Sequence, residues 1–222
     1  MLSPRERIRY HAVRVALRAL LRPAPPSDLV RLGSDYGGWW VPASAVRPGA
    51  LAYCAGVGED ITFDVALHDR GCDVVAIDPV PRAAAHVGTH GPADDRFTFH
   101  PYGLAAADGV VEFFPPRDPR HVSYSMANLQ GTAVATELPV RSLRSVMNAS
   151  GHDHIDILKL DIEGAEYEVL ARLLTDGPRP PVLCVEFDQP VPLRRTMRMC
   201  RRLRAGGYRV AQVERFNVTF LR

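Results

Sequence analysis

The sequence predicts an open α/β sheet of mostly parallel strands with helices on both faces. Residues 157–162 form a nearly continuous apolar run, as in a strand buried on both faces, and Gly164 breaks this run before an amphipathic helix begins. Residues 51–55 read as a second strand that passes through a glycine loop into a helix at 61–69. The apolar stretches 209–213 and 217–221 are joined by a short turn and predict a C-terminal hairpin.

Composition indicates one globular domain. The chain has 222 residues, of which 46% are hydrophobic, so it can bury one good core. A net charge of +2 is too small to indicate a nucleic-acid surface. The four cysteines lack C-x-x-C spacing, so we expect reduced, packed thiols in a cytoplasmic protein. No uncharged run approaches the roughly 18 to 20 residues of a membrane span.

Residues 1–31 are expected to form an amphipathic basic helix, from about 4 to 21, and a proline-rich linker, with the main domain at 32–222. Two interpretations of the helix are open. It docks on its own domain or on a second subunit in a homo-oligomer, or it binds an anionic membrane or ligand. The segment 33–42 carries both tryptophans among turn residues, and favours a hairpin over the wall of a ligand pocket.

The glycine loop indicates a nucleotide-binding site. Gly56 and Gly58 allow the backbone to approach a ligand closely, and the strand at 73–77 ends in Asp78, about 20 residues further on, where a carboxylate can accept hydrogen bonds from ribose hydroxyls. A dinucleotide site would have a third glycine where Ile61 stands, and Asp60 would repel a pyrophosphate. A positively charged sulfonium cofactor tolerates that acid.

The central strand carries three charges at alternate positions. Lys159, Asp161 and Glu163 are therefore expected to point to the same side of the sheet. Lys159 is the only lysine beside 26 arginines, and either it is paired for packing reasons or it tunes Asp161 at a reaction centre. The neighbouring strand ends near Glu186 and Asp188, so these carboxylates should crowd together at the carboxyl edge of the sheet.

Four segments together resemble the FkbM-type S-adenosylmethionine-dependent methyltransferases, closest to the branch that includes the methyltransferase-like 24 proteins. They are Gly-Val-Gly-Glu-Asp-Ile-Thr-Phe-Asp (56–64), Asp-Pro-Val-Pro (78–81), Ile-Leu-Lys-Leu-Asp-Ile-Glu-Gly-Ala-Glu-Tyr (157–167) and Val-Glu-Phe (185–187). The resemblance implies the class I methyltransferase Rossmann-like fold, with seven strands in the order 3-2-1-4-5-7-6 and strand 7 antiparallel. Two residues depart from the pattern, since Ala52 and Cys54 stand where many relatives carry an acid and another glycine.

The residue pattern and the resemblance together give expected roles for individual residues. The catalytic set is Lys159, Asp161, Glu163 and Glu186. The residues expected to bind S-adenosylmethionine, or its product S-adenosylhomocysteine, are Tyr53, Gly56, Gly58, Asp60, Thr62, Asp78, Pro79, Tyr102, Gly103, Leu104 and Asp161. The turn at 102–104 is either a stacking wall for the adenine or a plain turn. The irregular insert at 115–132 is expected to be a substrate lid, with His121, Ser123, Tyr124, Ser125 and Asn128.

The expected reaction is methyl transfer to a hydroxyl of a small molecule, a sugar or a secondary metabolite. Asp161 or Glu163 would act as general base, with Lys159 keeping it poised. Alternatively, Asp161 and Glu186 or Asp188 would bind Mg²⁺, which lowers the pKa of the acceptor hydroxyl. Two other classes stay open, a protein that binds the cofactor without catalysis and an NAD-type oxidoreductase.

Overall fold

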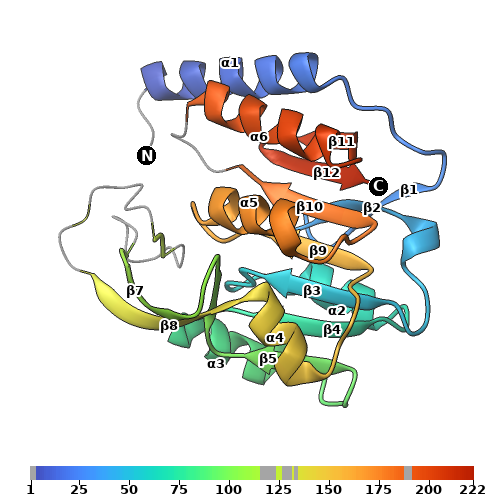
Figure 1. The fold of residues 1–222 in the computed structure, drawn as a ribbon, viewed down its shortest axis with the longest axis vertical. Helices are drawn as coiled ribbons and strands as arrows, with labels where there is room; N and C mark the ends of the chain where they lie inside the picture. The colour runs from blue at the N-terminus through green and yellow to red at the C-terminus, as the bar shows by residue number, and fades with distance from the viewer. Residues whose placement is uncertain (1–3, 116–123, 127–131, 133–134, 188–191) are drawn as a thin grey trace.

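The computed structural model describes residues 4–115, 124–126, 132, 135–187 and 192–222. Side chains of the N-terminal helix are described from residue 8 onward. Its main sheet has seven strands in the order β11-β12-β10-β9-β3-β4-β5 (Figure 1). β12 is antiparallel to both neighbours, whereas the other pairs are parallel, as predicted. The strands are β3 (Leu51–Ala55), β4 (Asp73–Ile77), β5 (Phe97–His100), β9 (Ile157–Leu160), β10 (Val182–Glu186), β11 (Arg209–Glu214) and β12 (Asn217–Leu221).

Helices cover both faces of this sheet, and each face has its own hydrophobic core. One core contains side chains of α1 (Pro4–Leu21), α4 (Leu143–Ser150), α5 (Glu166–Asp176) and α6 (Leu193–Ala205). The other contains side chains of α2 (Thr62–His68) and α3 (Pro81–His90), and of the antiparallel pair β1 (Leu29–Leu32) and β2 (Trp39–Pro42). A short 3-10 helix, η1 (Ala43–Ala45), follows β2. The sequence pattern had not predicted α3.

Strand alternation decides where the lone lysine lies. Leu158 and Leu160 belong to the core under α4, α5 and α6, whereas Ile157 belongs to the core under α2. Lys159 therefore faces the α2 side. In register it lies between Cys54 of β3 and Cys184 of β10. All four cysteines are free and buried, as predicted.

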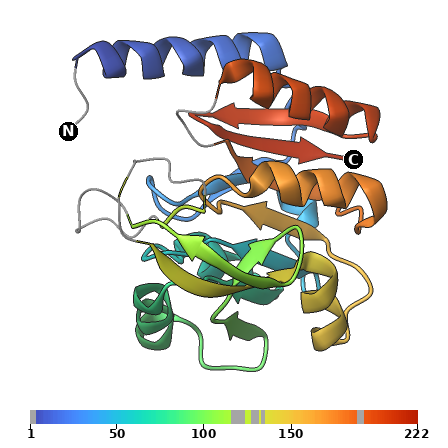
Figure 2. The ribbon, with the colours of Figure 1, turned by 60° about the vertical axis from the view of Figure 1, so that its left-hand side comes forward.

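A second, smaller sheet lies beside the carboxyl end of β4 and β5. It contains β6 (Gly103–Ala105), β7 (Gly109–Phe113) and β8 (Thr136–Ser142), in the order β6-β8-β7 (Figure 2). β7 and β8 lie on either side of the irregular insert and pair in antiparallel orientation. Two of the three residues of the expected turn at 102–104 belong to β6, which pairs in parallel with β8.

The N-terminal hairpin is confirmed, and it is attached to the last strands of the sheet. The Thr219 hydroxyl donates a hydrogen bond to the Trp40 carbonyl over 2.7 Å, and Arg31 pairs with Glu214 over 3.1 Å. Because β1 begins at Leu29, the domain boundary expected at residue 32 falls inside a strand. The hairpin therefore forms part of the wall around the carboxyl end of the sheet.

Helix α1 docks on its own domain, beside α6 and the edge strand β11 (Figure 1). Leu17 and Leu21 are fully buried there. Arg18 donates a 2.7 Å hydrogen bond to the Val213 carbonyl, and Arg204 of α6 donates to the Leu21 carbonyl. Within the part of the chain that the structure describes, no helix is long and apolar enough to cross a membrane.

The docking of α1 predicts a large contrast between two leucines of one helix. Leu17→Ala should lower the free energy of unfolding by about 2 to 5 kcal/mol, because it leaves a cavity in the core. Leu20→Ala is the matched control, since Leu20 is 51% exposed and its truncation should cost less than about 0.5 kcal/mol. Urea unfolding followed by circular dichroism measures both. Equal effects would contradict the docking.

Candidate active site

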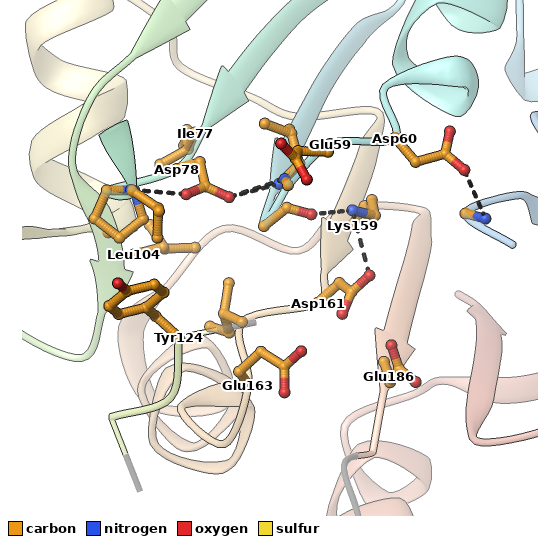
Figure 3. A pocket seen from close by; sticks show the side chains of 18 of the residues that line it. Glu59, Asp60, Ile77, Asp78, Leu104, Tyr124, Lys159, Asp161, Glu163 and Glu186 are labelled. Carbon is orange, nitrogen blue, oxygen red and sulfur yellow. Dashed lines mark hydrogen bonds and ion pairs between the residues drawn. The ribbon is translucent and has the colours of Figure 1, made fainter. Parts of the chain in front are cut away.

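A pocket of about 220 Å³ opens at the carboxyl ends of β3, β4, β9 and β10, where the fold predicts a ligand (Figure 3). It brings together eleven of the residues expected from the sequence. They are Gly56, Gly58, Asp60, Asp78, Pro79, Gly103, Leu104, Lys159, Asp161, Glu163 and Glu186.

Gly56 lets two loops of the site lie directly against each other. Its φ is +77°, and a Cβ built on it would lie 1.6 Å from the Asp161 carbonyl oxygen. The Asp161 N–H in turn donates a hydrogen bond to the Ala55 carbonyl over 3.1 Å. No side chain fits in that space, so glycine is required here by the contact between β3 and β9 loops rather than by a ligand.

Asp78 fixes the glycine loop from the tip of β4. One carboxylate oxygen accepts the N–H groups of Val57 and Gly58 at 3.1 and 3.0 Å, and the other accepts that of Val80 at 2.9 Å (Figure 3). Burial raises the pKa of Asp78, although these backbone donors oppose the shift. The carboxylate therefore holds the loop while it forms part of the pocket wall.

Lys159 lies at the floor of the pocket with 3% of its surface exposed. Its ammonium donates a hydrogen bond to the Gly56 carbonyl and lies 3.6 Å from an oxygen of Asp161 (Figure 3). Burial alone would lower the pKa of Lys159, but the carboxylates of Asp161 and Asp64 outweigh it and raise the pKa. The ammonium is therefore a fixed positive charge that joins the glycine loop to the loop after β9.

Asp161 and Glu186 form a carboxylate pair at the ends of β9 and β10. Burial raises the pKa of Glu186 well above its usual range, and the neighbouring Asp161 raises it further. The Glu186 carboxyl is therefore stabilised in its protonated form beside Asp161.

Strand alternation does not place Glu163, contrary to the expectation that it continues the pattern of Lys159 and Asp161. Strand β9 ends at Leu160, and Glu163 has a left-handed φ of +53°. Its carbonyl accepts a 2.6 Å hydrogen bond from the Ser125 hydroxyl. Glu163 reaches the pocket because of this turn, not because of a strand.

Glu166 is a buried carboxylate that the sequence did not single out. It accepts the N–H groups of Ile162 and Gly164 at 2.8 and 3.0 Å, and so closes the loop that carries Asp161 and Glu163. Burial raises the pKa of Glu166 to about 8. Glu166 is the first residue of α5 and stands two residues after Gly164, and this position was the available signal.

Asp60 joins the glycine loop to the N-terminal hairpin. It accepts hydrogen bonds from the Thr62 hydroxyl at 2.6 Å, from the Gly37 N–H at 3.1 Å and from the Ser34 hydroxyl. Burial would raise the pKa of Asp60, but the Ser34 and Thr62 bonds outweigh it and lower the pKa. Thr62, which was expected to bind the cofactor, does not line the pocket, and its hydroxyl is engaged in this contact.

Tyr53 and Tyr102 also lie outside the pocket, contrary to expectation. Tyr53 points to the opposite face of β3 from Cys54, and its hydroxyl is hydrogen-bonded to His152 over 2.8 Å. Tyr102 stacks on His100 with the ring centroids 5.1 Å apart. Strand alternation turns the first side chain away, and the start of β6 turns the second away.

Several lining residues come from segments that are remote in the sequence. They are Tyr36 and Trp39 of the hairpin, Phe113 of β7, Tyr124 and Met126 of the insert, and Arg215 and Asn217 at the β11–β12 turn. The tryptophans were a signal for the hairpin, and Tyr124 was expected in the lid, but the other residues carried no signal. Of the insert, Tyr124 lines the pocket and Ser125 bridges Phe114. The remaining lid candidates, His121, Ser123 and Asn128, lie outside the described residues.

A metal ion held by Asp161 and Glu186 or Asp188 was the alternative expected from the sequence. Among residues whose placement is described, no group of three or more histidine, cysteine, aspartate or glutamate side chains is arranged to hold an ion. Asp188, the third expected ligand, lies outside them.

The pKa of Glu166 predicts a pH-dependent stability. Between about pH 5 and 8 the folded protein keeps a proton that the unfolded chain releases, so the free energy of unfolding falls as the pH rises. Glu166→Gln removes this contribution. The variant should therefore gain stability relative to the parent by about 1 kcal/mol per pH unit across that window. Denaturant unfolding at several pH values measures the difference, and a constant difference would contradict the burial of a protonated carboxyl.

Comparison with known proteins agrees with this geometry. Residues 52–210 match the model of the methyltransferase FkbM domain. Over 128 residues the chain is 32% identical to the probable methyltransferase-like protein 24 of Rattus norvegicus and 30% identical to that of Homo sapiens. Each match covers 56% of this chain and 28% of the relative, so the chain spans well under half the length of these relatives.

Two solved structures are similar at a distance. The fibrillarin pre-rRNA processing protein of Methanococcus jannaschii has a TM-score of 0.45 and 12% identity, over 79% of this chain and 66% of its own. Human N-acetylserotonin methyltransferase, solved in complex with SAM, has a TM-score of 0.34 and 15% identity, over 81% and 48%. Such scores are too low to support an argument about function. The family match over most of the chain is sufficient by itself, and the chain belongs to the FkbM methyltransferase family.

Proposed function

We propose that the protein transfers a methyl group from S-adenosylmethionine to a hydroxyl oxygen of a small molecule, a sugar or a secondary metabolite. The observation that carries the proposal is the pocket itself. One cavity, in a chain of the FkbM methyltransferase family, joins a glycine loop, an acid at the tip of β4 and a carboxylate pair beside a buried ammonium.

The chemistry of the pocket wall fits this cofactor. Ile77, Val80, Leu104 and Phe113 provide an apolar wall of the kind an adenine ring requires. Asp78 is the residue that would accept hydrogen bonds from the ribose hydroxyls. Glu59, Asp161 and Glu163 make the remaining wall acidic, which suits the positive sulfonium and ammonium groups of the cofactor.

In the proposed mechanism the protein orients the acceptor and removes its proton. S-adenosylmethionine supplies, when bound, an electrophilic methyl group on a positively charged sulfur. Asp161 takes the proton of the acceptor hydroxyl, since the Lys159 ammonium 3.6 Å away favours a negative charge on it. Glu186, whose buried carboxyl favours the protonated form, donates a hydrogen bond to Asp161. Alignment of oxygen and methyl group provides most of the rate enhancement of such an in-line displacement.

The residues described do not fit a divalent cation as the activator of the hydroxyl, so we derive no step through a metal. Lys159 already occupies the position between the glycine loop and Asp161 in which a cation would compensate the carboxylates. The positive charge of the site is therefore the ammonium of Lys159.

The cofactor proposal predicts the outcome of calorimetric titrations with S-adenosylhomocysteine and with NAD. The protein should bind S-adenosylhomocysteine and not NAD. Asp78→Asn should weaken binding by about 1 to 3 kcal/mol, because hydrogen bonds to a charged acceptor are lost. Asp153→Asn is the control, since Asp153 is exposed and lies outside the pocket. Binding of NAD in place of S-adenosylhomocysteine would contradict the proposal and support an oxidoreductase.

A further inference from the structure

Helix α1 has two apolar faces, and only one of them is buried. Leu17 and Leu21 pack into the core, and Tyr10 packs edge-on against Phe216 with the ring centroids 5.5 Å apart. The opposite face carries Ile8, Ala12, Val15 and Ala19, which are spaced to form one stripe along the helix and are exposed. Ile8 is 70% exposed and Val15 is 56% exposed. We call these four residues the outer stripe.

Arginines border the outer stripe on both sides. Arg14 and Arg18 lie on the flank that faces β11, and helical spacing puts Arg9 on the other flank. Helix α6 runs beside α1 and exposes its own arginines (Figures 1 and 2). They are Arg194, Arg195, Arg198, Arg201, Arg202 and Arg204. Of these α6 arginines, only Arg195 forms an ion pair with another described residue, and its partner is Glu168.

The charge of the chain is strongly uneven as a result. α1 and α6 together contain eleven arginines and one acidic residue. The whole chain has a net charge of +2, so the remainder of the protein is net −8. The end of the molecule formed by α1 and α6 is therefore a concentrated positive surface that contains the apolar outer stripe.

We propose that this surface docks on a bilayer that contains anionic phospholipid. Ile8 and Val15 would enter the boundary between headgroups and acyl chains, while the bordering arginines bind the lipid phosphates. A second copy of the chain fits less well, because packing stripe on stripe would bring arginines of both copies together. A nucleic acid would pair its phosphates with the arginines but would leave the apolar outer stripe without a partner.

The docking surface is continuous with the rim of the pocket. Arg215 lines both the pocket and the groove between α1, Trp40 and β11. The next residue, Phe216, is the one that packs on Tyr10. Docking through α1 would therefore hold the pocket close to the lipid surface. The inference does not rest on methyl transfer, and it can be tested without the cofactor.

Vesicle co-sedimentation of the full chain tests the proposal. The protein should bind vesicles of phosphatidylcholine and phosphatidylserine, should not bind vesicles of phosphatidylcholine alone, and should be released as salt increases. Ile8→Glu/Val15→Glu should weaken binding at least about tenfold, because the buried aliphatic groups are lost. Arg14→Gln and Arg198→Gln should each weaken it about fivefold. Val110→Glu is the matched control, since Val110 is 63% exposed on β7, and should change nothing.

Three results would overturn the proposal. The first is equal binding to neutral and anionic vesicles. The second is anionic binding that Ile8→Glu/Val15→Glu leaves unchanged, which would indicate charge attraction alone. The third is a dimer in sedimentation that the double variant dissociates, without vesicle binding by the parent, which would assign the stripe to a second copy. Unchanged circular dichroism confirms that each variant is folded. The arginine variants provide the test if the double variant is not.

Discussion

The site depends on one buried positive charge. Lys159 contributes the ammonium that bonds the Gly56 carbonyl, pairs with Asp161 and faces Asp64 from the central strand. Asp64 is completely buried, its oxygens have no hydrogen-bond partner among the described residues, and burial raises its pKa to about 6. A buried ion costs several kcal/mol unless it is paired, so the lysine and its carboxylates are stable only together. Lys159 lies in register between Cys54 and Cys184, and its ammonium is a more compact charge than a planar guanidinium.

Around this charge, three other carboxylates act as connectors. Asp78 holds the glycine loop, Asp60 holds the hairpin, and Glu166 holds the loop after β9, each by accepting backbone N–H groups. An acid-rich pocket is thus not uniformly reactive. The connectors leave Asp161 and Glu186 as the pair on which we place the proton transfer. Asp60 adds no free carboxylate to the glycine loop, because its carboxylate accepts hydrogen bonds from Ser34 and Gly37 of the hairpin.

The sequence was informative wherever a local pattern determined the structure. The apolar runs of β3, β4, β9 and β10, the C-terminal hairpin and the acid at the tip of β4 were all predicted. α3 was not, because it buries only Ala83 and Val87 and therefore shows little apolar periodicity. Tyr53 and Tyr102 were expected at the pocket but do not line it, because their places depend on the direction of single side chains. Tyr36, Phe113 and Arg215 could not be predicted, since the hairpin, the small sheet and the β11–β12 turn meet the pocket only through long-range packing.

The central claim is that Lys159 and the buried carboxylates stabilise one another, and a double-mutant cycle tests it most directly. Unfolding free energies are measured for the parent, Lys159→Met, Asp64→Asn and the double variant at neutral pH. Lys159→Met alone should cost about 3 to 5 kcal/mol, because it leaves Asp64 buried without a counter-charge. The double variant should be more stable than Lys159→Met, since no unpaired charge then remains at Asp64. Costs that simply add would contradict the account.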